Sequence, residues 1–239
     1  MKSAVVTLNY DTLVEHGFVK IATMTKEGRP SHRSLYVIPL PDIRSRAATL
    51  YSPVLTDTFR LFKLHGSIGW AYSGSTSYFG ETIYDIGLNY GWAAAAAERV
   101  DDFKNAAPDK VPLIAPPTSS KSSFFANELM RSQWQLARVA LAPARKLYCL
   151  GYSLPMTDQA MRYFIRSSGT QELEIVPVNN DSNVYANYEE AFPLQRVETK
   201  FIGTDGPIPR FIEGWLAESG IASQVEELWA RRSESTEPA

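Results

Sequence analysis

Four short apolar runs, each followed directly by polar or glycine residues, constrain the fold of this chain more than any other feature. The runs occupy residues 4–8, 59–64, 146–150 and 173–178. Apolar runs of this length, bounded by turn residues, are typical of buried strands. Helix-like patterns follow several of them, and strands that alternate with helices favour a mostly parallel sheet covered on both faces. The sequence therefore predicts an α/β fold.

The remaining segments complete a single predicted domain over residues 1–232. Residues 72–110 are rich in Gly, Ser, Tyr and Ala, and we expect them to form a small, partly helical inserted subdomain. Apolar residues at helical spacing predict a helix over 124–141. Further helices are expected over 158–166, 183–191 and 208–231, and strands over 111–114 and 197–202. Residues 233–239 are expected to be disordered.

Near the N-terminus the sequence predicts short elements. Asp11 is placed to cap a short helix over 12–16. Residues 19–22 and 35–39 resemble strands, and Gly66 and Gly69 indicate a turn directly after the strand that ends at His65.

Composition excludes several classes of function. The 239 residues have a net charge of −2 and no block of like charge, so nothing points to nucleic acid or an anionic membrane. No apolar run of 18 residues predicts a membrane span, and the first residues lack the pattern of a signal peptide. The single cysteine, Cys149, excludes an internal disulfide and any Cys-x-x-Cys zinc site. We therefore expect a cytoplasmic protein that binds no metal.

Polar clusters follow four of the predicted strands. They are Asn9-Tyr10-Asp11, His65-Gly66, Gly151-Tyr152-Ser153 and Asn179-Asn180. The carboxyl ends of parallel strands lie at one edge of a sheet, where ligands bind in open α/β folds. We therefore expect the four clusters to converge on one cleft.

Several motifs resemble, in order and spacing, those of the sirtuin-like (silent-information-regulator-type) domain family. They are Thr7-Leu8-Asn9-Tyr10-Asp11, Lys63-Leu64-His65-Gly66-Ser67, Pro116-Pro117 with Lys121, and Gly151-Tyr152-Ser153-Leu154-Pro155 with Asp158. The resemblance extends from about residue 4 to about residue 193, and it includes the helix that holds Trp134. It implies a Rossmann-like fold and NAD as a substrate. One branch of the family removes acyl groups from lysine, and another, common in bacterial anti-phage defence, hydrolyses NAD.

The resemblance also implies roles for the first two clusters. Asn9 would face the nicotinamide ribose and position water or that ribose, and Asp11 would hold the nicotinamide carboxamide. His65 would be the general base, a role that suits an imidazole. The alternatives are a turn or cap residue for Asn9, a helix N-cap for Asp11, and a histidine satisfied at a strand end for His65. His16 and His32 have no such context and are interpreted as surface residues.

For the other two clusters the implied role is dinucleotide binding. Gly151 and Ser153 resemble the family's Gly-x-Ser turn, and a glycine there lets the backbone approach a ligand closely. Asn179 matches a position near the adenine ribose, and Asn180 is a substitute for it. The alternatives are a plain strand-to-helix turn and a tight asparagine turn.

The chain departs from the family pattern in three respects. No Gly-Ala-Gly-x-Ser loop, the first βα unit that binds the NAD phosphates, precedes Val5. We therefore expect a fragment of a longer protein that, alone, has little NAD hydrolysis and self-associates until a βα segment is restored in cis or by a partner. The four cysteines of the deacylase branch are missing, and Leu8 stands where that branch usually has glutamine.

The missing cysteines and Leu8 favour NAD hydrolysis to nicotinamide and ADP-ribose over deacylation. A non-catalytic module that binds NAD, ADP-ribose or a partner protein remains the main alternative. A protein deacylase or an ADP-ribosyl transferase is a further one. The trigger, the partner proteins and the oligomeric state are left open by the sequence.

Overall fold

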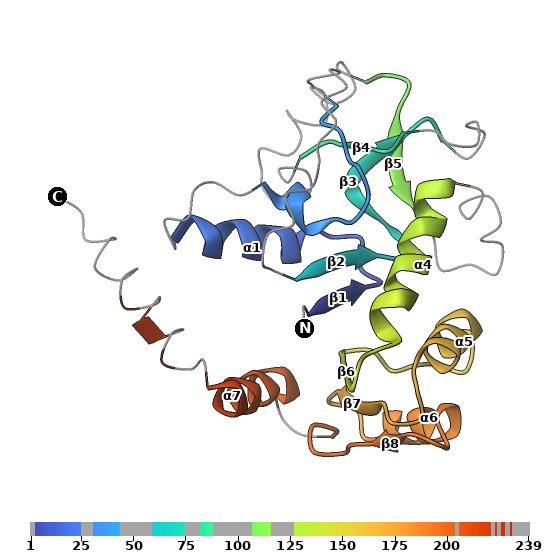
Figure 1. Ribbon diagram of the computed structural model, residues 1–239, viewed down its shortest axis with the longest axis vertical. Coiled ribbons are helices and arrows are strands. Elements are labelled where there is room, and N and C mark those ends of the chain that lie inside the picture. The colour runs from blue at the N-terminus through green and yellow to red at the C-terminus, as the bar shows by residue number, and fades with distance from the viewer. Residues whose placement is uncertain are drawn as a thin grey trace. The chain divides into compact units, whose positions relative to one another are not determined.

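The computed structural model describes residues 3–24, 31–43, 59–74, 82–87, 107–115, 127–203 and 206–220, together with 223, 226–227 and 230 (Figure 1). It is a mixed α/β structure with parallel strand pairing, and it divides into two compact units. Unit 1 comprises residues 1–137 and unit 2 comprises residues 138–239. The two units are described separately below. The predicted tail over 233–239 lies outside the described residues.

A parallel pair of strands contains the first two predicted runs. β1 (Ala4–Thr7) pairs with β2 (Arg60–Lys63), from Ala4 opposite Arg60 to Thr7 opposite Lys63. On the other side of β2, Tyr36 makes a single parallel bridge to Leu61. The strand predictions over 4–8 and 59–64 are therefore confirmed.

Two other strand predictions in unit 1 are wrong. Residues 19–22 belong to α1 (Leu13–Met24), which continues well beyond the expected short helix. Val14, Phe18 and Ala22, spaced four residues apart, pack in one core cluster, and this helical spacing prevails over the strand propensity of Val19 and Ile21. Residues 35–39 begin in the 3₁₀ helix η1 (His32–Leu35) and make only the Tyr36 bridge.

The second sheet of unit 1 is antiparallel. Its order is β4 (Tyr84–Asp85), β3 (Gly66–Tyr72) and β5 (Val111–Ile114). The turn expected over 66–69 is therefore wrong, because the chain turns at Leu64 and His65 and then continues as β3. The inserted subdomain falls largely outside the described residues, since 75–81 and 88–106 are not among them.

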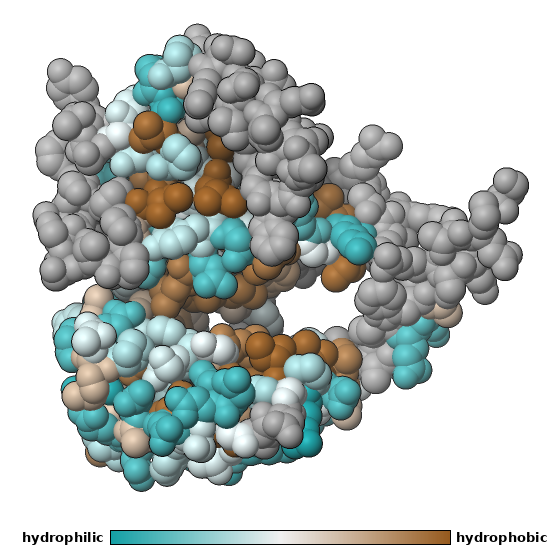
Figure 2. Space-filling model, turned by 180° about the vertical axis from the view of Figure 1, so that it is seen from behind, coloured by the Kyte–Doolittle hydropathy of each residue, from teal (hydrophilic) through white to brown (hydrophobic). Residues whose placement is uncertain are grey.

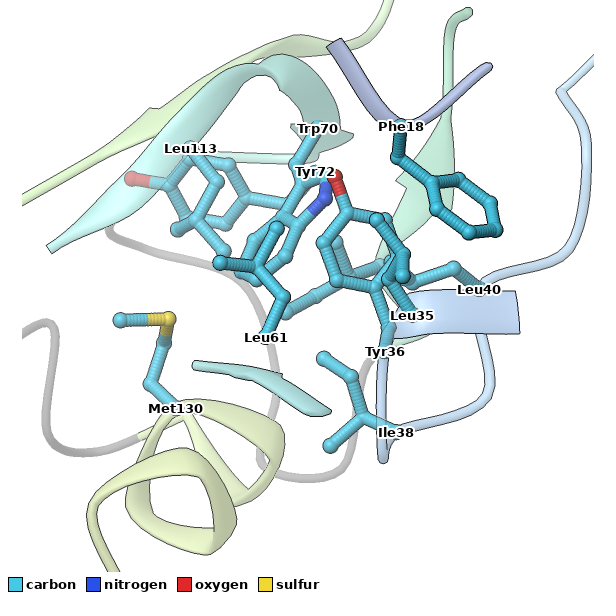
Figure 3. Close-up of a cluster of buried hydrophobic side chains, with 11 residues drawn as sticks. Phe18, Leu35, Tyr36, Ile38, Leu40, Leu61, Trp70, Tyr72, Leu113 and Met130 are labelled. Atoms are coloured by element: carbon cyan, nitrogen blue, oxygen red, sulfur yellow. The ribbon is translucent and has the colours of Figure 1, made fainter. Parts of the chain in front are cut away.

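The main core of unit 1 gathers side chains from α1, η1, both sheets and α4 (Glu128–Leu141) (Figure 3). Trp70 lies at its centre with no exposed surface, and the Tyr36 ring meets it edge-on with centroids 5.2 Å apart. α4 confirms the helix predicted over 124–141, although residues 124–126 lie outside the described part. Asn127 caps it by accepting from the N–H groups of Leu129 and Met130.

Unit 2 contains a parallel sheet with the order β6 (Lys146–Leu150), β7 (Glu174–Val178) and β8 (Arg196–Val197). β6 and β7 confirm the predicted strands, and β8 is shorter than the strand predicted over 197–202. The helices α5 (Gln159–Ser168) and α6 (Val184–Ala191) are close to their predicted ranges, and α7 (Pro207–Ser219) covers the first part of the range predicted over 208–231. Asp158 caps α5, accepting from the Met161 N–H.

Helices pack on both faces of this second sheet. Tyr148 and Cys149 are consecutive in β6, so their side chains point to opposite faces. The Tyr148 ring contacts Phe211 of α7, with centroids 4.9 Å apart, whereas Cys149 interacts with Tyr188 of α6. The predicted arrangement of a parallel sheet between helices is therefore present within unit 2 (Figure 1).

The surface mixes polar and apolar side chains, and Figure 2 shows apolar areas in brown among the teal. In α7, Ile208, Ile212 and Trp215 are all more than 40% exposed. Within the described ranges, the structure contains no helix that is both long enough and apolar enough to cross a membrane.

Candidate functional site

Asn9 and His65 follow neighbouring parallel strands at the same end of the β1–β2 pair. The ladder continues one residue beyond the strands, because the Leu64 N–H donates to the Thr7 carbonyl at 3.1 Å. Asn9 and His65 therefore both emerge where the pair ends. Within unit 1, the predicted convergence of these two backbone positions is observed.

Two hydrogen bonds fix the turn that holds His65. The Ala115 N–H donates to the His65 carbonyl at 2.8 Å, and the indole N–H of Trp134 donates to the Leu64 carbonyl at 2.9 Å. The imidazole is 5% exposed, with ring centroids 6.2 Å from Tyr10 and 6.3 Å from Trp134. His65 thus lies in an aromatic environment that limits its contact with water.

The loop from Asn9 to Asp11 is tied to the same region through its backbone. The Tyr10 carbonyl accepts from the Ile68 N–H at 2.9 Å and from the Ser67 hydroxyl at 3.4 Å. The Tyr10 hydroxyl donates to the Ala115 carbonyl at 3.2 Å, and burial raises the pKa of this phenol. Asn9, in contrast, is exposed, and it is a candidate for direct contact with a ligand.

Asp11 acts as a cap in the structure. Its Oδ1 accepts from the Leu13 N–H, at 3.0 Å, at the beginning of α1. The cap interpretation is therefore observed, and the role toward a nicotinamide carboxamide stays a prediction. One carboxylate oxygen suffices for the cap, so the two roles are compatible.

Beneath this loop lies a buried ion pair that sequence reasoning missed. The Lys63 ammonium is 3.0 Å from Oε1 of Glu15, and the two side chains are 1% and 0% exposed. Lys63 also donates to the Asp11 carbonyl, and the Tyr36 hydroxyl donates to Glu15 Oε1 at 2.6 Å. The one available signal was a lysine inside the apolar run Leu61-Phe62-Lys63-Leu64, because a lysine is almost never fully buried without a partner.

Tyr36 remains a hydrogen-bond donor in this network. Burial raises the pKa of its phenol well above the ordinary value, and the neighbouring Glu15 carboxylate raises it further. The phenol is therefore protonated at neutral pH and donates to the carboxylate.

His32 is held by a carboxylate, which corrects the prediction that His32 is a surface residue. Its side chain is 13% exposed, and Nε2 lies 3.1 Å from Oδ1 of the buried Asp85. Arg33 Nε approaches the other oxygen of Asp85 at 3.6 Å. Because Asp85 belongs to β4, these contacts join η1 to the antiparallel sheet.

In unit 2, Gly151 and Asn179 follow two more neighbouring parallel strands. Leu150 of β6 pairs with Val178 of β7, and the Gly151 N–H donates to the Val178 carbonyl at 2.9 Å. Gly151 has φ +68°, and a Cβ built there would meet no atom within 4 Å. Open space beside a left-handed glycine is what the close approach of a ligand to backbone requires.

Side chains from α6 and the start of α5 fix the turn from Gly151 to Ser153. The Tyr188 hydroxyl donates to the Tyr152 carbonyl at 2.8 Å, and Asn187 Nδ2 donates to the Ser153 carbonyl at 3.0 Å. The Tyr152 hydroxyl donates to Asp158 Oδ2 at 2.7 Å. Burial and the Asp158 carboxylate raise the pKa of Tyr152, so this bond keeps its proton at neutral pH.

Asn179 is buried and forms a local turn. Its Oδ1 accepts from the Asp181 N–H at 3.0 Å, and its backbone pairs with Phe201 and Gly203. Asn180 and Ser153 are exposed. The asparagine-turn alternative is thus observed for Asn179, while Asn180 and Ser153 present their side chains to solvent.

The turn allows a matched test of stability. Tyr188→Phe should lower the free energy of unfolding by about 1–2 kcal/mol, because it removes a buried hydroxyl bonded to the Tyr152 carbonyl. Tyr185→Phe, on the same helix, removes an exposed hydroxyl bonded to Glu189 and should change it by less than about 0.5 kcal/mol. Urea unfolding of both variants measures the difference, and equal effects would contradict the assigned role of Tyr188.

Among the described residues, no group of His, Cys, Asp and Glu is placed to hold a metal ion. Pro116, Pro117 and Lys121, which belong to the resembling motifs, lie outside the described residues. Comparisons of the chain with models of protein families, with curated proteins and with solved structures find no match.

Proposed function

We propose that this chain belongs to an NAD-hydrolysing protein with a Rossmann-like arrangement of elements, which releases nicotinamide and ADP-ribose. Asn9 and His65 act at the nicotinamide ribose, and Asp11 binds the carboxamide. Gly151, Ser153, Asn179 and Asn180 bind the dinucleotide. The observation that supports the proposal is that these residues follow paired parallel strands in each unit, Asn9 with His65 and Gly151 with Asn179.

The proposed reaction requires no general acid, only a base and a group that orients the water or the ribose hydroxyls. The bond between the ribose C1′ and the pyridinium nitrogen breaks, and its electron pair leaves with nicotinamide, which becomes neutral and needs no acid. Water adds to the oxocarbenium-like C1′, and His65 accepts the proton that the water loses. Asn9, whose amide both donates and accepts, orients the water or the ribose hydroxyls.

The environment of His65 suits this role. A base must be held in one orientation, and His65 is buried beside Tyr10 and Trp134 on a turn fixed by hydrogen bonds to its backbone. The same enclosure would limit the access of bulk water to the oxocarbenium-like centre.

The test measures nicotinamide release from NAD by the 239-residue chain, alone and with a Gly-Ala-Gly-x-Ser βα segment joined to its N-terminus. We expect turnover in the form that carries the segment and little in the other. Calorimetric titration with NAD and ADP-ribose runs beside it. Binding without release in both forms would assign a non-catalytic NAD-binding module instead. Release that requires an acyl-lysine peptide would assign a deacylase. No binding and no release in either form would refute the proposal.

We further propose that the setting is cytoplasmic, in bacterial anti-phage defence, where depletion of NAD stops an infection. This part is supported by the resemblance of the motifs alone. Its measurable consequence is a fall in cellular NAD when the active protein is triggered.

A further inference from the structure

Lys63 joins two segments that are far apart in the sequence. Its ammonium donates to the carbonyl of Asp11, the last residue of the Asn9–Asp11 loop. It also donates to the carboxylate of Glu15 in α1. Lys63 itself directly precedes the Leu64–His65 turn. One buried cation therefore connects the loop of one candidate catalytic residue to the turn of the other.

Glu15 pairs with the Lys63 ammonium rather than capping the beginning of its own helix, α1. Thr12 and Glu15 have the spacing of a capping box, in which the glutamate accepts from the threonine N–H and the threonine hydroxyl accepts in return. In the structure, Glu15 binds Lys63 and Tyr36 instead, and the Thr12 hydroxyl has no hydrogen-bond partner among the described residues. Asp11 supplies the cap to α1 in their place.

Stability alone does not account for the pair. Burying two charges costs several kilocalories per mole, and apolar side chains of similar volume are often equally stable or better. Tyr36, whose hydroxyl donates to Glu15, belongs to the apolar cluster that also contains Phe18 and Trp70 (Figure 3). One Glu15 oxygen, Oε2, is buried and has no hydrogen-bond partner in the part of the chain that the structure describes, which adds to the cost. What an apolar substitute could not do is donate to the Asp11 carbonyl.

We propose that Lys63, held by Glu15, is a positioning residue that fixes the Asn9–Asp11 loop relative to the His65 turn. Lys63 acts through the Asp11 carbonyl and touches no substrate. The kinetic consequence rests on the proposed function, whereas the position of the loop is a property of the fold and can be measured without a substrate.

The main test is a neutral triple variant of the whole chain, Glu15→Leu with Tyr36→Phe and Lys63→Met. Both members of the buried charge pair are then replaced, so no unpaired charge is left at this position and the urea midpoint should stay near that of the wild type. Amide hydrogen exchange should become at least about tenfold faster at Leu13 and Ile68, which bind Asp11 Oδ1 and the Tyr10 carbonyl. Exchange in β6 and β7 should not change.

Two single variants accompany it. Lys63→Met alone leaves the Glu15 carboxylate buried without its cation, and the folding equilibrium constant should fall about a hundredfold or more. Lys146→Met is the matched control, because Lys146 forms an exposed pair with Glu174 at 3.1 Å. It should change neither stability nor exchange in unit 1 appreciably.

Unchanged exchange at Leu13 and Ile68 in the triple variant would overturn the proposal. A triple variant that does not fold would assign the pair to the fold alone, which also overturns it. In a form that hydrolyses NAD, the triple variant should lower kcat at least about tenfold with KM within about twofold. If no form hydrolyses NAD, the exchange result still decides the position of the loop.

Discussion

Replacing His65 with glutamine should lower nicotinamide release from NAD by about a hundredfold or more, in the form of the protein that turns NAD over. A general base contributes a factor of this size, and glutamine cannot accept a proton at neutral pH. The side chain is of similar size and polar, so the turn bonded to Ala115 and Trp134 should persist. Asn9→Ala should cause a comparable loss without a change in stability, since Asn9 is exposed.

His32→Gln is the matched control for this prediction. His32 is a partly buried histidine of the same unit, bonded to Asp85, and the proposal gives it no catalytic role. Its loss should leave kcat within about twofold of the wild type. Circular dichroism and urea midpoints show that each variant is folded. Near-normal turnover by the His65 variant would remove His65 from the mechanism, and an equal loss in the His32 variant would show that the effect is not specific.

Gly66→Ala should be among the most destabilising single substitutions in unit 1. Gly66 has φ +82°, a conformation that costs a residue with a Cβ about 1–2 kcal/mol. A Cβ at this position would also collide with the carbonyl oxygen of Leu113 on β5, and neither backbone can move without breaking the sheet pairing. We expect the free energy of unfolding to fall by about 3 kcal/mol or more, a size typical of strain combined with overpacking.

Gly74→Ala separates the two causes. Gly74 also has a positive φ, +94°, but among the described residues a Cβ there would meet only the Val111 side chain, at 3.9 Å. This variant should lose only the backbone contribution of about 1–2 kcal/mol. Urea unfolding followed by tryptophan fluorescence reports on both, because Trp70 lies in β3, which contains Gly66 and ends two residues before Gly74. Equal losses in the two variants would mean that the contact with Leu113 costs nothing.

The same glycine explains why part of the fold was not predictable. Gly66 and Gly69 indicated a turn, yet both lie in β3, and the fit of Gly66 depends on strand β5, which is more than 40 residues away in sequence. The parallel strands were predictable because their apolar runs are continuous and local. The prediction of a strand over 19–22 was wrong because the side chains that pack with Phe18 have helical spacing, and their packing stabilises a helix.

In the candidate site, too, some features were predictable from local sequence patterns and others depended on long-range packing. The positions of Asn9, His65, Gly151 and Asn179 after strands followed from local patterns, and so did the cap formed by Asp11. The groups that support them could not be inferred in this way. Glu15 meets Lys63 across 48 residues, and Tyr188 meets the Tyr152 carbonyl across 36. Such pairs are visible only once the elements are packed, since each residue by itself resembles an ordinary helix or strand residue.

The packing of β6 against α6 also determines the chemical reactivity of the chain toward thiol reagents. Cys149 is the single cysteine, its side chain is buried against Tyr188, and burial raises its thiol pKa to about 11. Only the thiolate attacks a maleimide at an appreciable rate, so the native chain is nearly inert to such reagents at neutral pH. A cysteine introduced at an exposed position such as Asn180 would therefore accept a fluorophore selectively, and the wild-type background would not have to be removed.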